Sequence, residues 1–276
     1  MKHLNQFITE YIVKKKLDKA IDSEDHYKYS PISKTQLINN INECIDLGEY
    51  NLNVINVSNI KDMSKLFESV NLYKIKRGSK LDISKWNVSN VEFMNYMFSG
   101  TKNYIINVIN YKDIENWDVS NVISMSGMFD CCKDFNGDLS NWNVSSLKET
   151  EYMFNRCDRF KGKGLENWNM SNVYNTSQMF MFCTDLCCDL SKWDLSKLQI
   201  GYMMFLQCEN FDCDVSNWNV GKSNKLSNIH SMFKGCENFK GKGLDKWIID
   251  EKVDTYNALH GCYRIENTPS WYKQKI

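Results

Sequence analysis

The sequence has little proline, no long apolar run and no net charge. Only 2 of its 276 residues are proline, and no stretch approaches the roughly 20 consecutive apolar residues that a membrane-spanning helix needs. The first residues, MKHLNQFITEYIV, include polar side chains where a signal peptide needs an unbroken apolar region. We therefore expect no transmembrane segment and no signal peptide.

Charge and cysteine content narrow the classes of function further. The 34 basic and 34 acidic side chains cancel, so no overall positive field attracts nucleic acid, and we expect no nucleic-acid partner. The chain has 11 cysteines, an odd number, and we expect it not to be exported. Both points favour reduced thiols over a disulfide framework. With 42% hydrophobic residues, the chain has enough apolar surface to fold.

Tryptophan marks an internal repeat. The intervals are 31, 25, 26, 25, 25 and 29 residues along the series Trp86, Trp117, Trp142, Trp168, Trp193, Trp218 and Trp247. Twelve residues after each of the first five comes a phenylalanine preceded by methionine, at Phe98, Phe129, Phe154, Phe180 and Phe205. A sixth pair, Met232-Phe233, lies three residues late. Degenerate copies at both ends extend the series, so the pattern predicts eight units.

Each unit predicts one short strand and one short turn. Around Trp142, apolar Leu139 and Val144 are interleaved with polar asparagines, which favours a short strand there, while the segment that leads to the Met-Phe pair suits a short helical or 3₁₀ turn. A unit of about 25 residues cannot bury an apolar face alone, so neighbouring units must stack. The predicted fold class is therefore a repeat solenoid.

Six of the cysteines follow the same period. Each lies three residues past the aromatic of its unit, or past Leu259 in the last unit, in the series Cys132, Cys157, Cys183, Cys208, Cys236 and Cys262. A small apolar position in a core suits cysteine. We expect these six thiols to form one inward ladder beside the inward tryptophans and to remain unbridged.

Both ends of the predicted solenoid carry residues that suit caps. Residues 1–50 contain an amphipathic helix around residues 4–12, a polar linker, and a second helix between Ser33 as N-cap and Gly48 as stop, which we expect to close the first coil. Residues 51–262 form the solenoid of about eight coils. Residues 263–276 form a C-terminal cap in which Trp271 and Tyr272 cover the last coil.

The segments WDVSNVISMSGMF, from Trp117 to Phe129, and FNGDLSNWNVSS, from Phe135 to Ser146, resemble the BspA-like leucine-rich-repeat family. That family occurs in bacterial surface proteins, mycoplasma lipoproteins and some viral genomes. The resemblance covers about residues 50–262 and implies a leucine-rich-repeat-like solenoid with a helical N-terminal cap, used for protein binding or adhesion. A chain with this short opening looks most like stand-alone copies from bacteriophages and other large DNA viruses. The implied location is the cytoplasm of the host, or a virion, and a surface location would need a non-Sec route.

Candidate metal ligands and catalytic groups do not assemble into a known pattern. The cysteine groups are Cys183 with Cys187 and Cys188, Cys208 with Cys213, and Cys131 with Cys132, and the four histidines do not complete a zinc set with them. No nucleophile turn and no phosphate loop occurs. We expect no metal, no cofactor and no catalytic residue, and hence no enzyme.

Polar residues around each tryptophan are expected in turns. Aspartate stands four residues before five of the tryptophans, at Asp82, Asp113, Asp138, Asp189 and Asp214. Gly164 and Gly243 replace it in the two copies that contain Gly-Lys-Gly. An acidic ladder can bind calcium, but side chains that accept from turn amides explain the pattern better. We expect Gly-Lys-Gly to be a variant of the same turn.

The residues directly after the first six repeat tryptophans are the candidate binding strip. Strand alternation turns these side chains outward, at Asn87, Asp118, Asn143, Asn169, Asp194 and Asn219. They either form a solvated face with side-chain ladders or line a ligand surface. We expect a monomeric, non-enzymatic scaffold that binds a protein partner through an extended face. The alternative is a virion- or cell-surface-associated structural or adhesion protein with no separate small ligand.

Overall fold

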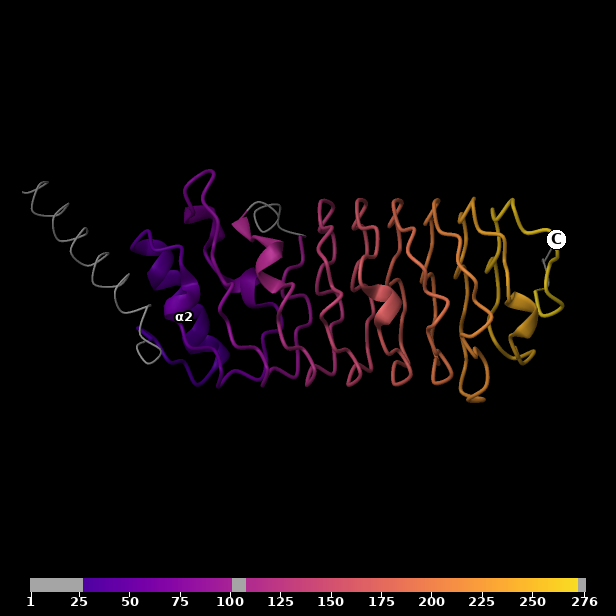
Figure 1. Cartoon of the computed structure of the whole chain (residues 1–276), viewed down its shortest axis with the longest axis horizontal. Coiled ribbons are helices and arrows are strands. Elements are labelled where there is room, and N and C mark those ends of the chain that lie inside the picture. Colours follow the sequence, from indigo (N-terminus) through magenta and orange to yellow (C-terminus); the bar gives the residue numbers. More distant parts are fainter. Residues whose placement is uncertain (1–26, 101–107, 273–276) are drawn as a thin grey trace, which may run out of the picture.

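The chain winds into successive coils that stack along one long axis (Figure 1). The structure, a computed structural model, describes residues 27–100 and 108–272. The colours in Figure 1 run in order along this axis, from the indigo end that carries helix α2 to the yellow end that carries the C-terminus. The amphipathic helix predicted around residues 4–12 lies outside the described residues.

Helix α2 (Lys34–Asp46) lies against the first coil. Its N-terminus is capped by Ser33, whose hydroxyl accepts a hydrogen bond from the backbone N–H of Gln36. Just past its end, Gly48 has a φ of +72°, the left-handed conformation that terminates many helices. The residues at Leu37, Ile41, Cys44 and Ile45 are buried, and their spacing of three and four residues places them on one face. The helix therefore covers the core at this end of the stack.

Beyond α2, the regular structure consists of short 3₁₀ helices and single parallel bridges. The 3₁₀ helices are η1 (Leu52–Val54), η2 (Leu66–Ser69), η3 (Leu72–Lys74), η4 (Tyr111–Ile114), η5 (Leu165–Asn167) and η6 (Leu244–Lys246). One column of parallel bridges joins every coil to the next, through Asp62, Phe93, Ser124, Glu149, Asn175, Ile200, Asn228 and Asp254. We call these eight residues the bridge positions. No longer strand occurs in the described ranges.

After each bridge position, backbone N–H groups alternate between two kinds of acceptor. Some donate to carbonyls of the next coil, and others donate to carbonyls of their own turn. In the coil of Glu149, the N–H groups of Thr150, Tyr152, Phe154 and Arg156 donate to carbonyls of the next coil at 2.8–3.0 Å. The intervening residues 153, 155 and 157 donate to the carbonyl three residues back. Because both sets are satisfied, the buried backbone carries little cost.

This alternation requires left-handed backbone at a fixed place. The third residue after every bridge position has a φ between 53° and 63°, in the series Lys65, Tyr96, Gly127, Tyr152, Gln178, Met203, Ser231 and Asn257. A positive φ at the third residue of a four-residue turn is typical of type II turns. Most of these residues are not glycine, so the conformation costs each of them roughly 1–2 kcal/mol, and the hydrogen bonds to the next coil offset that cost.

The strand predicted beside each tryptophan is wrong. Around Trp142 the backbone forms turns, and the bridge lies instead at Glu149, in the segment that was expected to be helical. The 3₁₀ turns also occur on the other side of the tryptophan, as in η5 and η6. The alternation of Leu139, Trp142 and Val144 reflects side chains that point into the coil from successive turns, which mimics the period of a strand.

Aromatic rings fill the inside of the coils in two main columns, and a second buried phenylalanine stacks on the first in four coils, at Phe135, Phe160, Phe211 and Phe239. One phenylalanine per coil stacks on the next with ring centroids 5.3–5.6 Å apart, through Phe67, Phe98, Phe129, Phe154, Phe180, Phe205 and Phe233. All seven tryptophans of the repeat are buried, and Trp142 stacks on Trp168 at 6.3 Å. These contacts bury large apolar rings, which is the main source of stability in such a stack.

The indole N–H groups tie each coil to the one before it. Trp193 and Trp218 donate from Nε1 to the carbonyls of Leu165 and Leu190, both at 2.8 Å, and Trp86, Trp142, Trp168 and Trp247 make the equivalent bond. Trp117 is the exception, since its Nε1 atom has no partner in the part of the chain that the structure describes. A buried tryptophan therefore contributes both apolar area and one satisfied donor.

Trp271 continues this column and is not a separate lid. Its ring stacks on Trp247 with a centroid distance of 5.9 Å and an interplanar angle of 8°, and its Nε1 atom donates to the carbonyl of Leu244 at 2.9 Å. These are the contacts of a repeat tryptophan. Trp271 lies within the predicted C-terminal cap, residues 263–276, where the rest of the repeat unit is missing from the pattern.

Replacing Trp168 by alanine tests the contribution of the tryptophan column. We expect Trp168→Ala to lower the free energy of unfolding by roughly 3–5 kcal/mol, because it leaves a cavity between coils and removes a buried hydrogen bond. The measurement is urea denaturation followed by circular dichroism. The control is Asn167→Ala, an exposed neighbour, for which we expect a change within about 0.5 kcal/mol. Equal losses would contradict the inward placement.

Gly164→Ala tests the close approach of neighbouring coils. Gly164 has a φ of +95°, and a Cβ atom there would lie 2.2 Å from the backbone nitrogen of Ser140 in the preceding coil. The control is Gly78→Ala, at a φ of +84° with nothing within 4 Å of the added atom. Both variants carry backbone strain, so we expect Gly164→Ala to lose roughly 1–3 kcal/mol more in denaturation, from the clash alone. Equal stability of the two variants would contradict the packing.

Candidate functional site

The six repeat cysteines form a hydrogen-bonded ladder inside the coils. Each Sγ atom donates to the carbonyl of a phenylalanine in the preceding coil at 2.9–3.1 Å, from Cys132, Cys157, Cys183, Cys208, Cys236 and Cys262. All are free thiols, and the first five are fully buried. Burial raises the pKa of Cys157, Cys208 and Cys236 well above the ordinary value. These thiols are therefore structural donors and poor nucleophiles.

The other cysteines do not combine into a metal site. Cys187 is exposed, and Cys188 and Cys131 are half-buried. Burial is the main cause that raises the pKa of Cys131 to about 11. In residues 27–100 and 108–272, no group of three or more histidine, cysteine, aspartate or glutamate side chains is arranged to hold a metal ion.

The residues predicted as a binding strip are used mainly for local turns. Five of them accept a hydrogen bond at Oδ1 from the N–H of the serine two residues later, at 3.0–3.1 Å, namely Asn87, Asp118, Asn143, Asn169 and Asp194. The sixth, Asn219, donates from Nδ2 to the carboxylate of Asp194 at 3.1 Å. The structure thus uses one side-chain oxygen of five of these residues, and the amide of the sixth, in hydrogen bonds within the protein.

The aspartates before the tryptophans form the same kind of turn. Asp82, Asp138, Asp189 and Asp214 each accept from the N–H of the serine two residues later, as predicted, and the side chain of Asp113 lies outside the described residues. In the Gly-Lys-Gly copies, Lys163 and Lys242 form ion pairs with Asp138 and Asp214 of the preceding coil at 2.6 and 2.7 Å. The hydrogen bond from Lys163 is the largest cause that lowers the pKa of Asp138 to about 2. Gly-Lys-Gly is therefore a turn variant that pairs with the neighbouring coil.

A second surface carries the aromatic and acidic side chains that sequence reasoning missed. It follows the column of bridge positions, and we call it the bridge face. Its members are Phe93, Tyr96, Glu149, Glu151, Tyr152, Tyr174, Asn175, Gln178, Tyr202, His230 and Tyr256. All are half-buried or exposed. Because the bridges align the coils, equivalent side chains lie next to each other along the stack.

Side-chain contacts link neighbouring coils on the bridge face in two groups. The Tyr174 hydroxyl donates to the carboxylate of Glu149, and Gln178 donates from Nε2 to the Tyr152 hydroxyl at 2.6 Å. Farther along, the ring of His230 lies between those of Tyr202 and Tyr256, with centroids 5.5 and 5.2 Å away. These contacts hold the side chains in place without a partner, which lowers the entropic cost of binding one.

The centre of the bridge face is negatively charged. Burial, and then the charge of Glu149, raise the pKa of Glu151 above its ordinary value. The hydrogen bond to Glu149 is the largest cause that raises the pKa of Tyr174 to about 12. Two carboxylates that repel each other among tyrosine rings favour a positively charged ligand group, through ion pairing and cation–π contact.

One signal for this face was present in the sequence. Tyrosine directly precedes methionine at Tyr96, Tyr152 and Tyr202, always in the segment that leads to the core phenylalanine. That segment was expected to be helical, so the side chains were not assigned to one surface. The bridge positions show that these tyrosines follow the same column of the stack.

Native alkylation tests the assignment of the thiols. We expect iodoacetamide to label Cys187 quickly in the folded protein, because it is the exposed cysteine, and to label the buried ladder only after denaturation. Peptide mass spectrometry before and after adding guanidinium gives the rate at each site. Cys157 labelled as fast as Cys187 in the native protein would contradict the buried ladder.

Comparison with known proteins agrees with the repeat. The model of the family described as "Mycoplasma protein of unknown function, DUF285" matches residues 35–163 and again residues 149–271. No curated protein and no solved structure matches the chain significantly. Within the described residues, no helix is both long enough and apolar enough to cross a membrane. The two matches together span most of the sequence, and the chain therefore belongs to the DUF285 family of repeat proteins.

Proposed function

We propose that the protein is a non-enzymatic scaffold that binds another protein through the bridge face, on a solenoid of the leucine-rich-repeat type. The observation that carries this proposal is the two groups of contacting tyrosine, glutamate and histidine side chains along the bridge positions. Tyrosine is enriched at protein interfaces because it combines a large apolar ring with a polar end. Solenoids of other families use such extended faces for recognition.

The distribution of side chains supports binding over catalysis. The tryptophan, phenylalanine and cysteine columns fill the inside of the coils, and the strip after the tryptophans is engaged in turns. The bridge face presents its polar and aromatic groups along a line, and they do not converge on one reacting atom. An extended line of contacts suits a macromolecule better than a small substrate.

The resemblance of the repeats to the BspA-like family supports the same reading, because adhesion to host proteins is known among its surface members. The alternative is a structural or adhesion component of a virion or cell surface that has no separate ligand. The two proposals differ in one observable. A scaffold has a partner that depends on the bridge face, and a purely structural component does not.

Charge reversal on the bridge face tests the proposal. Tagged full-length protein, Glu149→Lys/Glu151→Lys and a matched control, Glu209→Lys/Glu237→Lys, are used to capture proteins from cells of the source organism. Glu209 and Glu237 are exposed and lie outside the bridge face. We expect a partner held by the wild type and the control to fall about tenfold with the bridge-face variant, because opposed charges become like charges.

Two outcomes count against the scaffold. A partner captured equally by all three proteins would move recognition away from the bridge face. The absence of any captured protein would favour the structural alternative. Circular dichroism of each variant checks that the coils remain folded.

A further inference from the structure

The last coil ends in an open hydrogen-bonding edge. Its ladder residues are Thr255, Asn257, Leu259 and Gly261, which correspond to residues that donate to a following coil elsewhere in the stack. In the part of the chain that the structure describes, the N–H groups of Thr255, Asn257 and Gly261 have no acceptor, while the Tyr272 hydroxyl faces the N–H of Leu259. The carbonyl of Val253 likewise accepts no hydrogen bond there.

These groups have the pattern of a strand edge. Between the last coil and the one before it, Asp254 donates to the carbonyl of Ser227 and accepts from the N–H of Ile229, so one residue bonds on both sides of the bridge position Asn228. The Val253 carbonyl and the Thr255 N–H flank Asp254 in the same way. One residue of an added segment could therefore donate to the first and accept from the second. Unpaired edges of this kind are templates for added chain segments.

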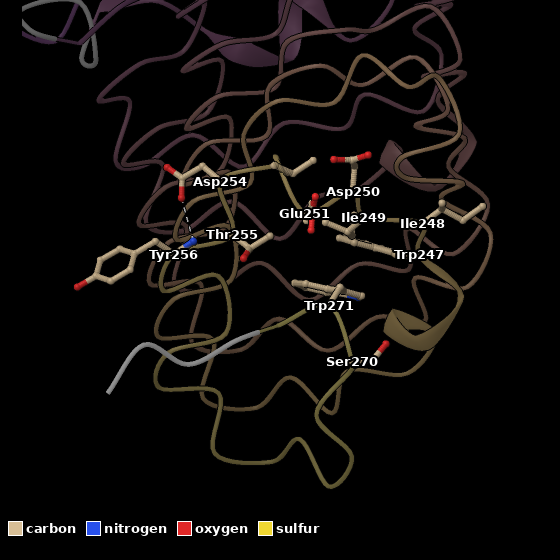
Figure 2. Close-up of a pocket in the computed structure, with 11 residues that line it drawn as sticks. Trp247, Ile248, Ile249, Asp250, Glu251, Asp254, Thr255, Tyr256, Ser270 and Trp271 are labelled. Atoms are coloured by element: carbon tan, nitrogen blue, oxygen red, sulfur yellow. Dashed lines mark hydrogen bonds between the residues drawn. The ribbon is translucent and has the colours of Figure 1, made fainter.

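A hollow of about 650 Å³ lies beside this edge (Figure 2). Trp271 occupies its middle, with Asp250 and Glu251 above the ring in this view and with Asp254 and Tyr256 to the left. The residues that line it include three carboxylates and no lysine or arginine. Thr255 faces the same hollow, at the position where Thr150 bonds the carbonyl of the next coil through its hydroxyl at 3.4 Å.

We propose that this open end binds a short extended segment of another protein that carries a lysine or arginine, added in parallel as one more rung. Its central residue donates to the Val253 carbonyl and accepts from the Thr255 N–H, and the carbonyl two residues later accepts from the Asn257 N–H. Paired side chains of parallel strands lie on the same side, about 4.8 Å apart, so the basic side chain lies beside Asp254. This site adjoins the end of the bridge face and shares Tyr256 with it, but it lies several coils away from Glu149 and Glu151.

Charge and packing favour such a partner over a second copy of this chain. Two open ends facing each other would bring six carboxylates together, which is unfavourable. The opposite end of a second copy is covered by α2, where Lys34 donates to Asp62 and to the carbonyl of Ser64 at 2.6 and 3.2 Å. A basic extended segment satisfies both the free backbone donors and the carboxylates that line the hollow.

The probe for this proposal is a fluorescein-labelled peptide, Gly-Ser-Lys-Val-Lys-Ser-amide, added to the full-length protein. We expect saturable binding below about 1 mM by fluorescence anisotropy, together with slower hydrogen exchange at the amides of Thr255 and Asn257. A peptide with glutamate in place of both lysines tests the charge. A peptide with both lysines methylated at the backbone nitrogen tests the rung, since it cannot donate to Val253.

The matched variants are Glu251→Gln/Asp254→Asn and, as control, Glu209→Gln/Glu237→Gln, which removes the same charge elsewhere. The side-chain amide oxygen that Asp254→Asn introduces can still accept from the Tyr256 N–H, as the Asp254 carboxylate does at 3.0 Å, so we expect the fold to persist. We expect binding to weaken about tenfold with the first pair and not with the control. Binding that is absent, or equal for the altered peptides or for both variants, would overturn the proposal.

Hydrogen exchange measured on the protein without peptide tests whether the edge is already filled by the chain's own residues or by a second copy. If the amides of Thr255 and Asn257 were already protected without peptide, the edge would be filled by the chain's own residues or by a second copy, and the proposal would be wrong. Dependence of that protection on protein concentration identifies the second copy. The two tests alter different carboxylates, Glu149 and Glu151 for the bridge face and Glu251 and Asp254 for the open end, so the two proposals can fail independently.

Discussion

The structure depends on one constraint, which is that buried N–H groups within a coil must find acceptors in two directions. Between Thr150 and Cys157, alternate N–H groups bond the next coil and the intervening ones close turns within their own coil. Satisfying both sets requires left-handed backbone at Tyr152 and Arg156. That geometry fixes the vertical spacing of the coils, and the rings, thiols and indoles then stack at the distances that the backbone sets.

The same constraint organises the surfaces. Because the bridge positions lie directly above one another, side chains such as Glu149 and Asn175 form a continuous face without belonging to a long strand. In the turns around the tryptophans, the Oδ1 atoms of Asn143 and Asn169 accept hydrogen bonds from the backbone two residues later. The two faces therefore differ in side-chain type, since the bridge face carries tyrosine and glutamate while the strip carries asparagine and aspartate.

Much of the architecture could be predicted from the sequence because the buried residues recur with a fixed period. Trp142, Phe154 and Cys157 are recognisable by their type alone, and Ser33 and Gly48 follow helix-capping rules. The local backbone could not be predicted in the same way. Residues such as Gln178 and Met203 adopt positive φ although nothing in their chemistry favours it, so the turn ladder resembled a helical segment, and the bridge face stayed hidden with it.

The uniform register of the ladder has an evolutionary consequence. Each coil presents the same donors to its successor, so a duplicated or deleted coil leaves the joint on either side chemically unchanged. Recombination between the repeats of the gene can thus lengthen or shorten the protein by whole coils, and each product can still stack. The length of the bridge face therefore changes in evolution by one coil at a time, while the side chains of each coil vary separately.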